Sequence, residues 1–197
     1  MTINKEDLIN SIMESLERIN YIDPDDIPNI DLYMDQVTTF MEERLKKSTR
    51  NPDDKVLTKT MINNYAKNDL LPPPVKKKYS KDHIMMLIFI YYYKGVLSIN
   101  DIQTLFKPIT DNFFNTEEDF SLEDIYSEIV HMEIQQIEGM QKDIAGKFKI
   151  AESTFSEAPE ENKEFLKLFS FVSLLSFDVY VKQLLIEKII DGYRTEE

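Results

Sequence analysis

The chain has 197 residues, of which 42% are hydrophobic, so it can form one domain with a sizeable core or a small domain joined to a second. It has no cysteine and only four scattered glycines, which excludes disulfides, thiol nucleophiles, cysteine-ligated metals and glycine-rich phosphate loops. The formal net charge of −13 hides an asymmetry, because residues 44–107 carry 13 basic and 5 acidic side chains between two strongly acidic segments.

The first 47 residues contain two expected helices and a proline-containing connector. Residues 3–19 place apolar side chains at steps of three to five residues, which predicts an amphipathic helix with an acidic outer face. Pro24 and Pro28 end it within an acidic connector. Helical spacing resumes over residues 32–47. The acidic start of the chain lacks the basic and apolar regions of a secretory signal.

A short polar helix and a lysine-rich segment follow. Thr58 is a suitable N-cap for a helix over residues 59–69, and the run Pro72-Pro73-Pro74 (72–74) ends it, because proline cannot continue a helix. The next segment, VKKKY, is expected to be short and extended. Val75 and Tyr79 are its expected anchors, with three lysines between them.

Two further capped helices complete the basic block. Ser80 is expected to cap a strongly apolar helix, KDHIMMLIFIYYYKGV. Ser98 is expected to cap a shorter helix, INDIQTLF, which Pro108 stops.

Beyond residue 108 the sequence is helical and acidic. Apolar residues recur at helical spacing from Leu122 to Phe148, and a long last helix is expected over about residues 161–190. It contains FLKLFSFVSLLSF, which is typical of a helix central to the core or buried against a partner chain. Its charge-free run, Leu168 to Phe177, falls short of the ~18 residues that suggest a membrane span. A cytoplasmic protein without a membrane partner is therefore expected.

The expected fold class is mainly α, with a small β wing and an all-helical C-terminal region. We expect three segments: an acidic N-terminal helix and connector (1–30), a winged helix-turn-helix domain (31–107), and an acidic helical region for dimerisation or sensing (108–197). The acidic N-terminal arm is expected to shield the basic face, so that deleting residues 1–26 would tighten binding to a polyanion.

The basic block contains a candidate nucleic-acid site. A helix-turn-helix needs a first helix that supports a second one, whose polar side chains reach base edges or phosphates in the major groove. Asparagine can pair bidentately with adenine and lysine contacts phosphates. The candidate DNA-binding residues are Lys59, Thr60, Asn63, Asn64 and Lys67 on the helix, opposite Met61, Ile62 and Tyr65, and Lys76, Lys77 and Lys78 in the wing.

The same residues resemble the winged helix-turn-helix of MerR-type proteins. MINNY (61–65) stands in the place of the TIRYY motif, DLLP (69–72) in the GLL-P place, KKY (77–79) at the wing end and SINDI (98–102) in the S-L-x-E-I place. The chain departs from this pattern where Asn63 replaces the usual arginine. One strong phosphate contact is thereby lost, so that affinity would rest on the lysines.

A narrower resemblance covers about residues 27–130. LYMDQVTTFMEERL, LTKTMINNYAKNDLLPPPVKKKYSKDHI and LSINDIQTLF are similar to the uncharacterised bacterial family called domain of unknown function 1836. This resemblance implies a MerR-like DNA-binding fold and brings no activity with it.

Other chemistry is weakly indicated. Glu128 and His131 have the Glu-x-x-His spacing of di-iron sites, but no second such motif exists, so no metal or cofactor is expected. The three tyrosines 91–93 could stack on bases, although core packing is the commoner role of such a cluster. No Ser/His/acid or paired-acid arrangement stands out, so an enzyme is not expected.

The sequence therefore predicts a sequence-specific DNA-binding transcriptional regulator. Its expected partners are double-stranded DNA and a second copy of the chain, bound through the C-terminal helices, and no effector ligand is indicated. The alternative is a non-catalytic interaction adaptor whose basic face docks an acidic partner.

Overall fold

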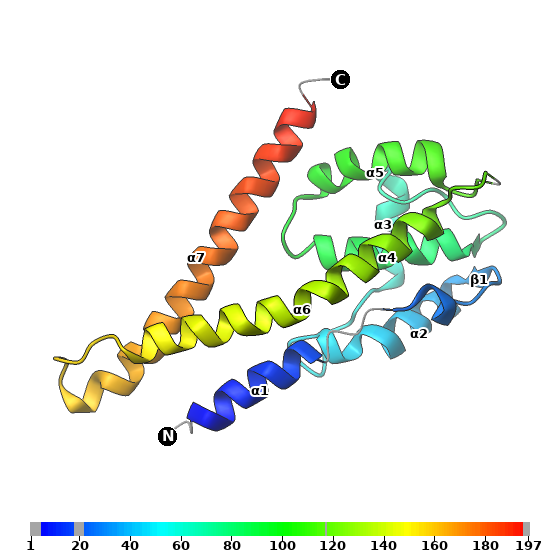
Figure 1. Ribbon diagram of the computed structural model, residues 1–197. Coiled ribbons are helices and arrows are strands. Elements are labelled where there is room, and N and C mark those ends of the chain that lie inside the picture. Colours follow the sequence, from blue (N-terminus) through cyan, green and yellow to red (C-terminus); the bar gives the residue numbers. More distant parts are fainter. Residues whose placement is uncertain (1–4, 18–21, 117, 195–197) are drawn as a thin grey trace. The chain divides into compact units, whose positions relative to one another are not determined.

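The computed structural model describes residues 5–17, 22–116 and 118–194, and it is 72% helix and 3% strand (Figure 1). The described helices are α1 (Lys5–Glu17), α2 (Met34–Leu45), α3 (Lys59–Lys67), α4 (Lys81–Tyr93), α5 (Ile99–Phe113), α6 (Leu122–Glu152) and α7 (Glu160–Arg194), with short 3-10 turns η1 (Pro24–Asp26) and η2 (Lys46–Ser48). Strands β1 (Leu32–Tyr33) and β2 (Lys78–Tyr79) pair antiparallel. The predicted mainly α class with a small sheet is confirmed.

The chain divides into two compact units that share the long helices α6 and α7. Unit 1 comprises residues 1–17 and 135–189, and unit 2 comprises residues 18–134 and 190–197. The basic block lies wholly in unit 2.

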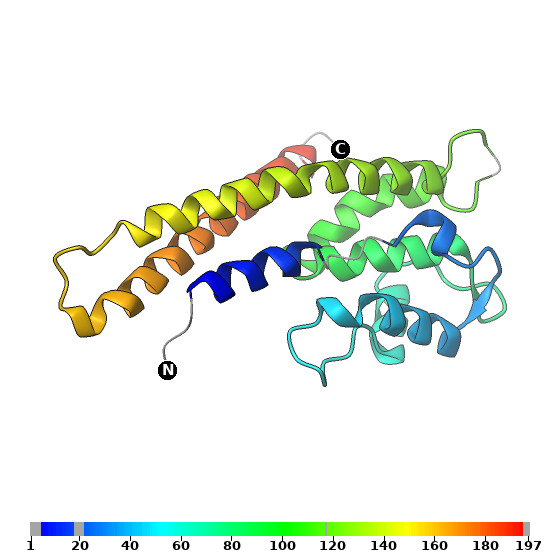
Figure 2. The same ribbon diagram turned by 60° about the horizontal axis from the view of Figure 1, so that its bottom comes forward.

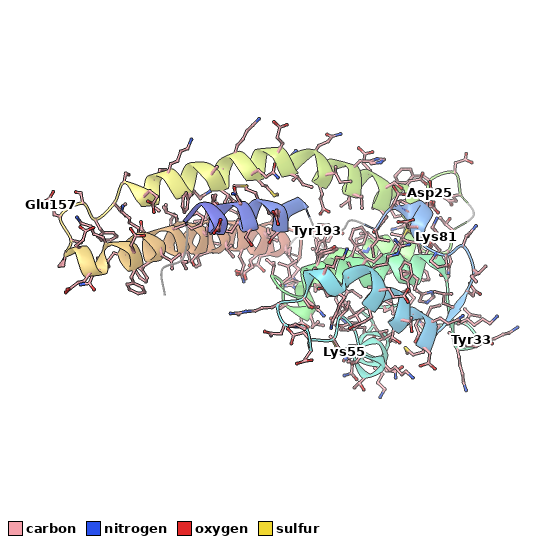
Figure 3. The ribbon with its side chains drawn as sticks, turned by 90° about the horizontal axis from the view of Figure 1, so that it is seen from below. Asp25, Tyr33, Lys55, Lys81, Glu157 and Tyr193 are labelled. Atoms are coloured by element: carbon pink, nitrogen blue, oxygen red, sulfur yellow. The ribbon has the colours of Figure 1, made fainter. Side chains whose placement is uncertain are left out.

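Helix α4 is the centre of unit 2. Its residues from His83 to Ile90 are all buried, as expected for a helix that is apolar on every side. It is surrounded by buried side chains of four other helices: Val37, Met41 and Leu45 of α2, Ile62 and Tyr65 of α3, Ile102 and Phe106 of α5, and Leu122, Tyr126 and Val130 of α6. Each such side chain contributes roughly 1.5–3 kcal/mol when fully buried. At the start of α4, the Lys81 ammonium donates to the Glu123 carboxylate at 2.7 Å (Lys81 is labelled in Figure 3).

The connector before α2 belongs to this core. Ile22 and Ile27 are buried, and the Tyr126 hydroxyl donates to the Ile22 carbonyl at 2.7 Å. Deleting residues 1–26 would therefore remove core contacts together with the acidic arm, so that deletion does not isolate the effect of charge.

Two helices start as predicted, and one continues further. The Thr58 hydroxyl accepts the Met61 N–H at 3.2 Å, and Ser98 forms a reciprocal capping box with Asp101. The prediction that Pro108 stops the second helix is wrong, because α5 runs to Phe113. Interior proline costs roughly 3 kcal/mol. The turns beyond it offset that cost, since their apolar side chains pack against the core.

The lysine-rich segment is a tight turn and not the predicted extended run. Lys76 and Lys77 have φ values of 49° and 66°, so only Lys78 and Tyr79 are extended. Tyr79 is buried as an anchor, but Val75 is 64% exposed, so the prediction that Val75 anchors the segment is wrong.

In unit 1, the C-terminal part of α6 and the following α7 run antiparallel (Figure 2). The Phe148 and Phe171 rings meet edge-to-face at 5.3 Å, and the Lys147 ammonium lies 3.5 Å from the Asp178 carboxylate. Phe171 is the buried residue of α7 in the described part of this unit, so the expectation that α7 is central to a core is wrong for the single chain. Of the described helices, α7 alone has the length and apolar composition that could cross a membrane.

Candidate nucleic-acid interface

Helix α3 buries one side and exposes the other. Ile62 and Tyr65 are buried against the core, whereas the predicted DNA-binding residues of the helix are all exposed. At 100° per residue these polar side chains span about 140° of the helix surface. They are Lys59, Thr60, Asn63, Asn64 and Lys67.

The start of α3 is linked to the start of α2. The Lys59 ammonium forms an ion pair with the Asp35 carboxylate, and both side chains are largely exposed, at 59% and 76%. An exposed pair of this kind contributes only about 0–1 kcal/mol, so an incoming anion can compete with Asp35 for the lysine.

The three-lysine turn presents its charges on a strained backbone. The Val75 N–H donates to the Lys78 carbonyl at 3.1 Å and the Lys78 N–H returns to the Val75 carbonyl at 2.9 Å, which leaves Lys76 and Lys77 as the central residues of a two-residue turn. Both have the positive φ that defines a type I′ turn, where Asn-Gly is the usual pair. A left-handed conformation costs roughly 1–2 kcal/mol for a residue with a β-carbon. Both lysines are exposed.

Tyr33 connects the turn to the helices. Its residue pairs with Lys78 across the two strands, and the Lys78 ammonium lies 5.4 Å from the centre of the Tyr33 ring. Figure 3 shows Tyr33 at the edge of unit 2, where α2 begins. Asp35, which pairs with Lys59, is in the first turn of the same helix. The contacts therefore place the start of α3 and the lysine turn beside the same end of α2.

Among the described residues, the remaining lysines of the site make no ion pair. Lys67, Lys76 and Lys77 lie within 4 Å of no described carboxylate. Elsewhere in the basic block the charges are used internally: Glu42 lies 2.9 Å from Lys46 and 3.8 Å from Lys55, and the Lys46 hydrogen bond holds the pKa of the Glu42 carboxyl below its usual value. The open positive charge of this unit thus includes α3 and the turn.

The sequence did not indicate the roles of Tyr33 and Asp35. A two-residue strand such as β1 has no readable alternation, so the pairing that brings Tyr33 to Lys78 is visible only in three dimensions. Likewise, nothing in the spacing of Asp35 and Lys59 predicts their ion pair.

The other sequence candidates lie apart from this surface or in the core. His83 is buried, and His131 and Glu128 are exposed on α6. The described residues include no group of three or more His, Cys, Asp or Glu side chains placed to hold a metal ion. Tyr91 is half-buried, with its hydroxyl 2.7 Å from the Ser48 hydroxyl.

Unit 2 is thus a small helical domain with a two-stranded sheet and one exposed polar, cationic helix face. The chain matches the family described as "Domain of unknown function (DUF1836)" over residues 22–129, more than half of its length, and it belongs to that family. The family region begins at the buried Ile22 and ends within α6, so it covers the core around α4. No curated protein and no solved structure matches the chain.

Proposed function

We propose that the protein is a transcriptional regulator that binds duplex DNA through a winged helix-turn-helix of the MerR type. In this proposal α2 is the supporting helix, α3 enters the major groove, and the turn between Val75 and Lys78 is the wing. The observation that carries the proposal is the exposed polar face of α3 beside a lysine turn. This placement is suited to a helix in a groove and a wing on the flanking phosphates.

The exposed side chains divide into two roles. Asn63 and Asn64 carry amides that can donate to and accept from an adenine edge. Lys59, Lys67 and the three turn lysines supply phosphate contacts, which position the protein without reading sequence. Lys59 would exchange Asp35 for a phosphate on binding.

The strained turn favours this reading over a surface that is merely solubilising. A conformation that disfavours lysine is retained at two successive lysines, and such strain is a recognised sign of a functional constraint. The exposed amides of α3 add to this, because an adaptor that docks an acidic protein needs cations but no base-reading groups.

Binding to DNA selected from the source genome tests the proposal. A regulator of this type prefers its own site over random duplex by about 10³-fold or more at physiological salt. An adaptor whose basic face docks an acidic protein, the alternative function, would bind DNA weakly and without preference. Fluorescence anisotropy with selected and scrambled duplexes at equal salt distinguishes the two. In this proposal the protein acts in the cytoplasm and has no catalytic activity.

A further inference from the structure

One side of α7 within unit 1 is apolar, uncharged and exposed. We call it the outer face of α7, and every one of its residues is exposed: Phe165, Phe169, Val172, Ser173, Ser176, Phe177, Tyr180 and Leu184. Their steps along the helix cover about 140° of its circumference at 100° per residue. The helix is the long orange-to-red element of Figure 1.

The charges of the same segment are engaged on other sides. The Lys167 ammonium lies 3.8 Å from Glu152 of α6, and the Asp178 carboxylate lies 3.5 Å from Lys147 of α6 and 2.9 Å from Lys182. The outer face therefore offers nothing to a charged partner. It matches only another apolar surface.

The exposed area is that of a protein interface. The six apolar side chains of the outer face are between 50% and 67% exposed. With roughly 150–250 Å² for a buried aromatic side chain, together they leave on the order of 700 Å² accessible. This exceeds the largest patch of a typical monomer, about 300–600 Å², and approaches the roughly 800 Å² that each partner contributes to a standard interface.

The outer face reads the same in both directions. Successive members are separated by 4, 3, 1, 3, 1, 3 and 4 residues, so the pattern is symmetric about the midpoint between residues 174 and 175. A two-fold axis there would place Phe165 opposite Leu184, Phe169 opposite Tyr180, Val172 opposite Phe177 and Ser173 opposite Ser176. In a two-fold interface residue i meets j and j meets i, which is the relation these pairs have. The small serines at the centre let two helices approach closely.

We propose that a second copy of this chain covers the outer face, with the two α7 helices antiparallel and crossing at Ser173 and Ser176. A lipid bilayer fits less well, because Lys167, Asp178 and Lys182 would enter it at about 2.5–3.5 kcal/mol for each charge at the helix centre. The inference goes beyond DNA binding and does not depend on it.

Oligomeric state provides the first test. Sedimentation velocity at micromolar concentration should give the mass of two chains for the wild type and of one chain for Phe169→Glu. The matched control is Ile150→Glu, at a position of α6 that is 57% exposed but outside the outer face, and it should stay dimeric. Circular dichroism confirms that each variant remains helical. A monomeric wild type, or equal behaviour of the two variants, overturns the proposal.

The absence of cysteine allows a test of direction. In the antiparallel pair, Phe165 lies about 28 Å along the axis from its own symmetry mate, at 1.5 Å per residue, but opposite Leu184 of the other copy. A disulfide needs Cα atoms within about 7 Å. Oxidising a mixture of Phe165→Cys and Leu184→Cys should therefore give a cross-linked heterodimer, and Phe165→Cys alone should not cross-link.

Two other outcomes contradict the arrangement. Efficient cross-linking of Phe165→Cys to itself would indicate parallel helices. Flotation of the wild-type chain with phosphatidylcholine vesicles, lost in Phe169→Glu, would indicate that lipid covers the face. Neither experiment contains DNA, so a failure here leaves the proposed DNA binding to be judged by its own test.

Discussion

At the scale of single residues, Lys76 and Lys77 are at odds with their own backbone. Both adopt the left-handed conformation, which Asn and Gly adopt at lower cost. We expect the double variant Lys76→Asn, Lys77→Gly to raise the free energy of unfolding by about 1–2 kcal/mol, because the strain is relieved. The same variant should bind DNA more weakly and reduce the salt slope by about two, because two phosphate contacts are lost. Urea denaturation and anisotropy titrations measure the two effects.

The opposite signs make this prediction sharp. A variant that merely misfolds would lose stability and binding together. A variant of a purely solubilising turn would gain stability and leave DNA binding unchanged. A charge-matched control is Lys149→Asn, because Lys149 is an exposed lysine of α6 in unit 1. It should leave DNA binding unchanged.

Two exposed residues of α3 should fail in different ways. Asn63→Ala should weaken binding to the selected duplex by about 1–3 kcal/mol and relax the preference at one base pair, because the amide reads a base edge. Lys67→Ala should weaken binding to all duplexes alike, because phosphates carry no sequence information. Both side chains are exposed, so unfolding should change by no more than about 0.5 kcal/mol. Binding to a panel of single-base variants of the site separates the roles; identical profiles would contradict them.

At the scale of elements, α4 carries a buried histidine beside the wing. His83 is 1% exposed, its ring lies 4.8 Å from that of Phe114 and 5.4 Å from that of Tyr79, and its Nδ1 accepts the Ser80 N–H at 3.0 Å. Burial lowers the pKa of His83, and the carbonyl groups of Pro72 and Pro73 only partly oppose this effect.

The sign of the resulting pH dependence follows. Below pH ~6.5 the unfolded chain binds a proton at this position and the folded chain does not. The free energy of unfolding should therefore fall as the pH decreases from about 6.5, by up to about 1.4 kcal/mol for each unit by which the pKa is lowered. Above pH 6.5 this contribution is constant. Urea denaturation between about pH 5.5 and 8 measures the slope.

Comparison of variants isolates His83 from other titrating groups. Burial raises the pKa of the Asp82 and Glu133 carboxyls, which acts in the opposite direction because the folded chain then binds the extra proton. We expect His83→Gln to be less stable overall but to lose the acid-side decline. His131→Gln, at an exposed position of α6, should retain it. A decline that persists unchanged in His83→Gln would rule out His83 as its source.

The elements also show what a sequence can predict. Helices with periodic apolar faces and capping residues, such as α3 after Thr58, are readable because the signal lies within one segment. The pairing of Tyr33 with Lys78 is not, because two-residue strands carry no pattern. The length of α5 beyond Pro108 was missed because core contacts overrode a local rule. The candidate site was predictable as exposed residues of one helix and one turn, but its ion pair with Asp35 and the strain of the turn were not.

At the scale of the whole molecule, the net charge of −13 and the proposed affinity for DNA are compatible because screening makes charge local. At physiological salt the Debye length is about 8 Å, so a phosphate at the wing senses the lysines nearby far more than distant acids. The acidic C-terminal region then acts as a solubilising body for a basic surface. It also keeps two copies soluble while an apolar face of α7 joins them.

This separation of charge predicts a steep response to salt. If Lys59, Lys67, Lys76, Lys77 and Lys78 each neutralise one phosphate, the logarithm of the binding constant should fall with the logarithm of salt concentration with a slope of about −4 to −5 per bound chain. Raising potassium chloride from 50 to 200 mM would then weaken binding by roughly 10²–10³-fold, despite the acidity of the chain. Anisotropy titrations at four or five salt concentrations give the slope. A slope near zero would contradict the assigned phosphate contacts, since an acidic protein without a local cationic face has no counterions to release from DNA.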